Sequence, residues 1–479
     1  TRIRRLRFSP NYIAGAVDEL SFGLTNGFTL SSLTAQGELH HGRYLTLRNA
    51  QATLPNSQFA LPLLRLDLGG KGLKLLHEVE LADTYLALSD FAPFFPQLGE
   101  HKERLYLRGL YTARTMETGQ GSLSVRLPGL LNLEEQLSLS WNQYGALSSV
   151  QLDTETLEVR QGLIELVKPY LPASLHSALD YGKQLGALSY HGHLDYKVAG
   201  AIKARGTLGT DLGKWQHDLE AYLVDKSLRK VRADLSTESF LLTPLLGGKV
   251  PLERLGATIK LEAQRSTDRL EDWQVGATIT SPQLTYQGYT YRDLSLAIRP
   301  LRPYRHELQL SVNDPNASLS VRGAASFDGK VVRDMDLSLS TDLHPEALGL
   351  SQLLGKYNIK ATGSANFDVL NIDRGHGMLA LQSLSLTTPK QTLSLHDLQL
   401  QLIGSPESGR LIHIASPYLT AQLSGHYTIS QILPDLKQTL RHYLPALQRE
   451  ESLKRPLLAP ARSSYELDVK IKKVPEEWA

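Results

Sequence analysis

The stretch SPYLTAQLSGHYTISQILPDLKQTLRHYLP, residues 416–445, changes its hydrophobic period halfway along. In its first half the apolar or small residues occupy alternate positions: Leu419, Ala421, Leu423, Gly425, Tyr427 and Ile429. The positions between them are polar, as in a strand with one buried face. In its second half Leu436, Leu440 and Leu444 recur at helical spacing between Pro434 and Pro445. The stretch therefore predicts a strand followed by a short amphipathic helix.

The same alternation returns along the rest of the chain, for example in residues 255–263, 273–280, 316–329, 333–343 and 359–369. A glycine repeatedly takes an apolar position of the alternation: Gly37, Gly109, Gly192, Gly206, Gly323, Gly363 and Gly425. Glycine within a strand marks a sharp bend or a close approach of another group.

Five short segments have helical spacing instead: 88–98, 160–171, 238–246, 344–357 and 436–444. Because many strands follow one another between these segments, the pattern predicts a mainly β protein that is predominantly antiparallel. We expect residues 1–450 to form one continuous repeating β-region with short interrupting helices. Residues 451–479, which contain Pro456 and Pro460, are expected to be a linker and the start of a further strand.

Composition excludes several classes of function. The 51 basic and 49 acidic residues nearly cancel, so the chain has no field suited to nucleic acid. The absence of cysteine excludes disulfides and thiolate metal sites. No apolar run approaches the roughly 18 residues that a membrane-spanning helix needs.

The sequence signal for a catalytic or metal site is weak. His191 and His193 share one face of a predicted strand, and His40 and His41 lie in a turn, but no carboxylate stands at metal-ligand spacing beside them. The aspartates of RDMDLSLSTDL, residues 333–343, all fall on the polar positions of a strand. We therefore expect no enzymatic activity, no metal and no cofactor.

The apolar face of the predicted strands has two interpretations. A closed sandwich or barrel would bury this face in its own core. An open, curved sheet is favoured for two reasons. The strand pattern does not divide into units of about 100 residues, the size of a sandwich domain, and helices interrupt the strands at irregular intervals. Such a sheet would expose more apolar surface than a monomer tolerates unless a ligand or partner covers it.

Four segments resemble the TamB proteins of Bacteroidetes-type bacteria, members of the AsmA-like group. They are residues 416–447, in which a strand leads into a helix ending near Tyr-x-Pro, together with residues 6–59, 185–213 and 232–263, in the same order as in that family. The membrane anchor and the C-terminal TamB domain of full-length members are not evident, so the chain resembles a periplasmic middle fragment.

This resemblance implies an elongated, curved, repeating β-groove, taco-like in section, that conducts phospholipid acyl chains between the inner and outer membranes. It implies a periplasmic location in a Gram-negative bacterium, an inner-membrane anchor outside this chain, and an outer-membrane assembly-factor barrel as partner. Two alternatives stay open. One is a scaffold that helps outer-membrane protein assembly by pairing client strands with a sheet edge, and the other is a structural stalk with a filled core.

The expected groove-lining residues follow from the alternation and from this resemblance. They are Leu255, Ile259, Leu261, Val275, Ile279, Leu319, Val321, Phe327, Met335, Leu337, Leu339, Ile359, Phe367, Leu419, Leu423, Tyr427 and Ile429.

Overall fold

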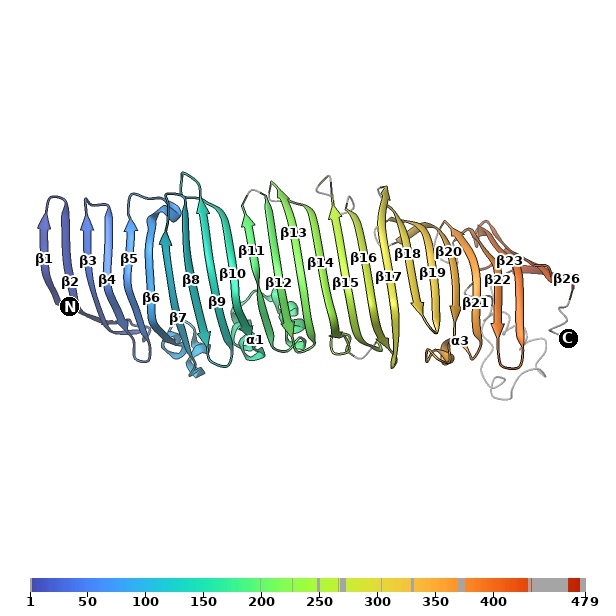
Figure 1. Ribbon diagram of the computed structural model, residues 1–479, viewed down its shortest axis with the longest axis horizontal. Coiled ribbons are helices and arrows are strands. Elements are labelled where there is room, and N and C mark those ends of the chain that lie inside the picture. Colours follow the sequence, from blue (N-terminus) through green and yellow to red (C-terminus); the bar gives the residue numbers. More distant parts are fainter. Residues whose placement is uncertain are drawn as a thin grey trace. The chain divides into compact units, whose positions relative to one another are not determined.

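The chain is a mainly β protein, with 70% of its residues in strands and 8% in helices (Figure 1). The computed structural model describes residues 2–198, 200–225, 227–247, 250–265, 267, 273–302, 304–328, 331–368, 375–429, 432 and 464–473. Backbone contacts divide the chain into two units, Thr1–Val250 and Pro251–Ala479, hereafter unit 1 and unit 2. The expected antiparallel, repeating β-architecture with few helices is confirmed.

Unit 1 is an antiparallel sheet in which each strand pairs with the next one along the chain. Its strands are β1 (Arg2–Ser9), β2 (Tyr12–Gly23), β3 (Thr29–His40), β4 (Tyr44–Thr53), β5 (Gln58–Asp67), β6 (Leu76–Ala87), β7 (Arg104–Ala113), β8 (Thr118–Leu127), β9 (Leu131–Trp141), β10 (Leu147–Val159), β11 (Leu188–Lys197), β12 (Ala201–Thr210), β13 (Gly213–Val224) and β14 (Ser227–Leu241).

Unit 2 repeats this arrangement, again with antiparallel pairing between consecutive strands. Its strands are β15 (Leu252–Gln264), β16 (Gln274–Tyr286), β17 (Tyr289–Arg302), β18 (Arg305–Asp314), β19 (Ala317–Asp328), β20 (Val331–Leu343), β21 (Asn358–Phe367), β22 (Gly377–Thr387), β23 (Thr392–Ser405), β24 (Gly409–Ala415), β25 (Leu419–His426) and β26 (Ser464–Ile471). The described strands of this unit follow one another as an open sheet. The further strand expected after residue 450 is present as β26.

The helices are short and lie in the connections between strands. They are η1 (Gly72–Leu75), η2 (Leu88–Phe91), η3 (Pro96–Glu100), α1 (Gln161–Val167), η4 (Lys168–Tyr170), α2 (Ala173–Gln184) and α3 (Ser351–Leu354). In unit 1, η2 and η3 follow β6, and α1, η4 and α2 follow β10. Because both groups follow even-numbered strands of an antiparallel succession, they lie at the same edge of the sheet (Figure 1).

Three of the predicted helical segments contain a helix, and one is wrong. Helices occur within residues 88–98, 160–171 and 344–357, whereas 238–246 begins as the end of β14 and continues as a turn. The strand extends there because Phe240 pairs with Gly213 and packs on Trp215, with ring centroids 5.5 Å apart. The helix expected over 436–444 lies outside the described residues, and α2 was not predicted.

Some strands contain a residue in the left-handed conformation. Asn49 (φ 50°) in β4 falls opposite Pro62 of β5, and Asp293 (φ 49°) in β17 falls opposite Pro282 of β16. Proline cannot donate a ladder hydrogen bond, and Asn and Asp tolerate this conformation better than most residues. The ladder therefore has a local irregularity at these positions, of the kind that bends a strand.

Few large apolar side chains are buried, and these lie mostly near the ends of strands. Leu127 and Trp141 are the last residues of β8 and β9, and Phe240 is next to last in β14. Leu348 is buried in the connection between β20 and β21. Within the described residues, the middle of the sheet in each unit therefore has no second covering layer of the kind that usually buries an apolar sheet face.

Candidate functional site

One face of the sheet in unit 2 is apolar from its first strand to its last. Strand register places twelve residues, one from each strand, side by side in a row: Leu261, Ala277, Ile298, Leu308, Gly323, Leu337, Ala365, Leu379, Leu400, Ile414, Ala421 and Val469. Because paired residues of neighbouring strands point to the same side, these twelve positions lie on one face. The row contains no polar or charged side chain.

The next residue of each strand lies on the opposite face, and that row is mainly polar. It consists of Lys260, Thr278, Ala297, Gln309, Arg322, Ser338, Ser364, Ala380, Gln399, Ala415, Thr420 and Lys470. The faces that contain the first and second rows are called the apolar face and the polar face. The predicted alternation is therefore confirmed as a difference between two faces of one sheet.

The apolar face of unit 2 is not a buried core. None of the twelve residues of its row is buried: eleven are partly exposed, and Val469 is 50% exposed. An antiparallel sheet in a compact protein usually packs its apolar face against another layer. A continuous apolar surface that is partly exposed, as here, is the kind of surface that a ligand or a partner can cover.

Unit 1 has an apolar face of the same kind. Register aligns thirteen residues from β2 to β14: Gly15, Gly37, Leu47, Leu64, Val79, Tyr111, Gly121, Leu137, Leu152, Leu194, Ala204, Leu219 and Ala233. Only Tyr111 and Ala233 are buried, and Leu219 is exposed.

A second row on this face, two residues away along each strand, contains polar side chains. From β6 to β14 it consists of Leu81, Gly109, Leu123, Glu135, Thr154, Gly192, Gly206, His217 and Leu235. The Thr154 hydroxyl donates a 2.8 Å hydrogen bond to Glu135 Oε2, whereas Glu135 Oε1 is buried without a described partner. Glu135, Thr154, Tyr190 and His217 are together called the polar inlay.

Tyr190 occupies the space left by the two glycines of this row. A Cβ at Gly192 or Gly206 would come within 2.5 or 3.0 Å of the Tyr190 hydroxyl. That hydroxyl lies 3.4 Å from His217 Nε2, and the two rings stack with centroids 5.5 Å apart. Burial, together with the nearby charge of Glu135, raises the pKa of Tyr190, and burial lowers the pKa of His217. The close approach predicted at strand glycines is therefore confirmed here.

Most of the predicted groove-lining residues lie on the apolar face of unit 2. Leu261 and Leu337 belong to its central row, and the neighbouring rows contain Ile259, Val275, Ile279, Leu319, Val321, Met335, Leu339, Ile359, Phe367, Leu419 and Leu423. Phe327 meets His306 of this face edge-to-face, with centroids 5.7 Å apart. Leu255 pairs with Leu284 beyond a register shift after Gly256.

Tyr427 and Ile429 are not strand residues, so the expected strand is shorter than predicted. β25 ends at His426 although the apolar alternation continues in the sequence. Tyr427 is buried, and its hydroxyl donates a 2.9 Å hydrogen bond to the carbonyl oxygen of Leu423. This contact folds the side chain back over β25, so that Tyr427 does not extend the exposed face.

Several of the histidines and acidic residues considered in the sequence have ordinary surface partners. His193 Nδ1 lies 2.5 Å from Asp153 Oδ1, and His191 Nδ1 contacts the carbonyl oxygen of Glu155 at 2.9 Å. Asp334 pairs with Arg305 on the polar face. Among the described residues, no three His, Asp or Glu side chains are arranged to hold a metal ion.

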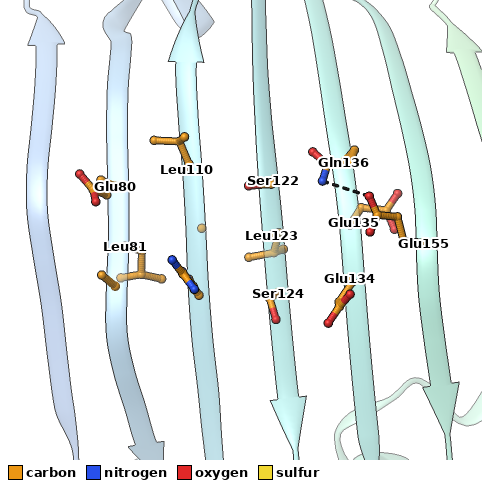
Figure 2. A pocket seen from close by; sticks show the side chains of 13 residues that line it. Glu80, Leu81, Leu110, Ser122, Leu123, Ser124, Glu134, Glu135, Gln136 and Glu155 are labelled. Atoms are coloured by element: carbon orange, nitrogen blue, oxygen red, sulfur yellow. Dashed lines mark hydrogen bonds between the residues drawn. The ribbon is translucent and has the colours of Figure 1, made fainter.

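The polar face of unit 1 carries an acidic depression of about 360 Å³ over β6–β10 (Figure 2). Its lining includes Glu80, Glu134 and Glu155, and the amide of Gln136 donates a 3.3 Å hydrogen bond to Glu155 Oε1. The exposed Leu110 lies between Glu80 and Ser122 in the register. The negative charge of this depression disfavours anionic ligands.

Comparison with known proteins identifies no family: no family model matches the chain, and no curated protein or solved structure is significantly similar to it. Within the described part of the chain, no helix is both long and apolar enough to cross a membrane.

Proposed function

We propose that the apolar faces bind the acyl chains of phospholipids, and that the protein conducts phospholipids between the inner and outer membranes of a bacterial envelope. The observation that carries this proposal is the row of twelve apolar residues in unit 2, none of which is buried. An acyl chain on this row keeps apolar contact as it passes from strand to strand, at about 0.8 kcal/mol for each buried CH₂ group. Its charged headgroup stays in water.

The partial exposure of the row suits a ligand that must move. Fully enclosed side chains would hold a lipid in one position and would not admit a headgroup. A face that is open along its length allows the lipid to shift while the contacts remain chemically alike. The resemblance to the TamB family supports the same role, a periplasmic location, an inner-membrane anchor outside this chain and an outer-membrane barrel as partner.

The outer strands favour a second candidate, a scaffold for outer-membrane protein assembly. Leu467 and Ile471 of β26 are 62% and 72% exposed, and Phe8 of β1 is 69% exposed. Among the described strands, β26 pairs with β25 alone and β1 with β2 alone. A strand whose second edge is unpaired can template an incoming strand of a client protein.

Photo-crosslinking along β25 in living cells separates these functions. Leu423 lies between Ile412 and Leu467 on the apolar face, whereas Gln422 lies between His413 and Asp468 on the polar face. We expect a photo-reactive residue at Leu419 or Leu423 of the full-length protein to capture phospholipid. The same residue at Thr420, Gln422 or Ser424 should not, because successive side chains of a strand point to opposite faces.

The chemical nature of the crosslinked adducts distinguishes the possible functions. Protein adducts in place of lipid would support the scaffold, and purely internal crosslinks would support a filled core. Lipid adducts of equal yield at both sets of positions would contradict the assignment of the apolar face to lipid.

A further inference from the structure

A pocket of about 630 Å³ lies at one edge of unit 1, where four connections between strands meet. These connections are residues 41–43, 68–75, 114–117 and 142–146. Each follows an odd-numbered strand, so all four lie at the edge opposite α1 and α2. The pocket is therefore assembled from turns that are far apart in the sequence and adjacent in the sheet.

The lining of this pocket is cationic. Four permanent cations, Arg43, Lys71, Lys74 and Arg114, face one carboxylate, Asp67, which leaves an excess of three positive charges. Arg43 binds Asp67 through two hydrogen bonds, Nε to Oδ1 at 2.6 Å and Nη2 to Oδ2 at 2.7 Å. These bonds hold the pKa of Asp67 below its usual range, so its charge is already compensated. Among the described residues, Lys71 and Arg114 make no ion pair and are exposed.

The turns hold one another in place. Leu73 donates a 3.0 Å backbone hydrogen bond to Gly145, and Lys74 Nζ donates a 2.8 Å hydrogen bond to the carbonyl oxygen of Gln143. Gly145 adopts φ 78°, and a Cβ there would lie 1.8 Å from the carbonyl oxygen of Lys71. The geometry of the cationic pocket is thus fixed by direct contacts between two turns, and both require glycine, because a Cβ at Gly72 (φ 57°) would lie 2.3 Å from the carbonyl oxygen of Gly145.

The pocket is also bordered by apolar side chains and joins the apolar face. Met116 and Tyr144, which line it, are 87% and 73% exposed. Ala113 and Trp141, also in the lining, follow Tyr111 and Leu139 of the apolar face by two positions along their strands. Because residues two apart in a strand share a face, the apolar face of unit 1 leads into the pocket. This combination of cations and apolar surface fits an amphiphile with an anionic head better than a small soluble anion.

We propose that this pocket binds the phosphodiester group of a phospholipid whose acyl chain lies on the apolar face of unit 1. The inference rests on the proposed function and adds a headgroup site to it. Arginine matches the oxygens of a phosphate with its planar donors, and lysine supplies a mobile point charge. Arg114 and Lys71 are the free cations, whereas Arg43 and Lys74 are oriented by Asp67 and Gln143.

Two lipids with the same single acyl chain test this site, lysophosphatidylglycerol and the uncharged monoacylglycerol. Their dissociation constants are measured below the micellar concentration for the wild type and for Lys71→Glu/Arg114→Glu. We expect the wild type to bind the phosphate-bearing lipid about ten-fold or more tightly than the neutral lipid, since hydrogen bonds to charged groups are the stronger kind. Charge reversal should remove this preference and leave monoacylglycerol binding unchanged.

A matched control changes charge by the same amount outside the pocket. Arg48→Glu/Arg126→Glu replaces two exposed cations of β4 and β8 that do not line it, and it should keep the preference. If the reversed variant is unstable, Lys71→Ala/Arg114→Ala serves in its place and should also reduce the preference. Melting temperatures identify any variant that has lost its fold.

The inference is overturned if the wild type binds both lipids equally, or if the control loses the preference as fully as the pocket variant. It is also overturned if glycerol 3-phosphate displaces the lipid at similar concentrations, because the pocket would then recognise a soluble phosphate. Failure of the wild type to bind either lipid would overturn the proposed function itself, and the headgroup site with it.

Discussion

The apolar faces of the two units differ in where their polar side chains lie. In unit 2, His306 and Arg410 are second residues of β18 and β24, so they border the face at strand ends. In unit 1, Glu135 and His217 lie in the middle of β9 and β13. The central row is therefore apolar in both units, but in unit 1 the neighbouring row carries the hydrogen-bonding groups of Glu135, Thr154 and His217 in mid-strand.

The polar inlay has an energetic consequence for an acyl chain. A CH₂ group placed against Glu135 cannot satisfy the free Oε1 oxygen, and a buried carboxylate oxygen without a partner costs free energy. The same CH₂ group on Leu337 or Leu379 meets only carbon. Unit 1 should thus favour a lipid in certain positions, and unit 2 should be indifferent to position.

The largest expected effect is that of an arginine at Leu337 in unit 2. Leu337→Arg puts a guanidinium between Gly323 and Ala365 in the unbroken row. We expect crosslinking of lipid at Leu423 to fall by a factor of about ten or more, because the charge must keep its water. The melting temperature should change little, since the partly exposed arginine can reach solvent.

Two matched substitutions test whether this effect depends on the face and on the unit. Ser338→Arg, on the polar face, should have almost no effect on lipid capture. Leu137→Arg in unit 1 should have a smaller effect than Leu337→Arg, because Glu135 lies two residues away on the same face and can pair with the guanidinium. Unfolding of the Leu337→Arg protein would show that the face is a core and would contradict the comparison.

An intermediate effect is expected when the inlay is removed. Glu135→Leu replaces a carboxylate, one of whose oxygens has no described partner, with an apolar side chain and should raise the free energy of unfolding by about 1–2 kcal/mol. Lipid capture in unit 1 should rise several-fold because the row then stays apolar from Leu123 through position 135, and its next polar side chain is Thr154. Chemical denaturation and crosslinking yield measure the two quantities.

The neighbouring Glu134 provides the control for this change. It is exposed on the polar face, so Glu134→Leu should alter the free energy of unfolding by no more than about 0.5 kcal/mol. A loss of stability in Glu135→Leu would show that the carboxylate is satisfied in the native protein, and the contrast between the units would then have to be abandoned.

The sequence predicts the faces of these sheets well because alternation and strand register describe the same geometry. Leu319, Val321 and Leu337 were assigned to one face by parity, and the register confirms that assignment. The end of β25 was not predicted because Tyr427 continues the parity after the chain has left the sheet. The position of the Tyr427 side chain depends on a hydrogen bond to the carbonyl oxygen of Leu423, which no periodic pattern encodes.

The polar inlay and the cationic pocket were missed for different reasons. Strict attention to parity in LNLEEQLSLSW, residues 131–141, would have found Glu135, which occupies an apolar position between Leu133 and Leu137. No periodic pattern in the sequence indicates the cationic pocket. Lys71 and Arg114 come together only because both turns follow odd-numbered strands and the intervening strands form a single layer.

The smallest expected effect concerns the histidines of the two apolar faces. Burial lowers the pKa of both His217 in unit 1 and His306 in unit 2, but at His217 the charge of Asp218 opposes this shift. A lowered pKa means that the unfolded chain binds more protons below about pH 6.5, so stability is lost as the pH falls through that range.

Replacing either histidine with phenylalanine should lessen the loss of stability between pH 7.5 and pH 5.5. His306→Phe should lessen it more, because no carboxylate offsets burial there, and His396→Phe at an exposed position of β23 controls for the substitution itself. Melting temperatures at the two pH values measure the difference, and a larger rescue by His217→Phe would place the stronger acid response in unit 1.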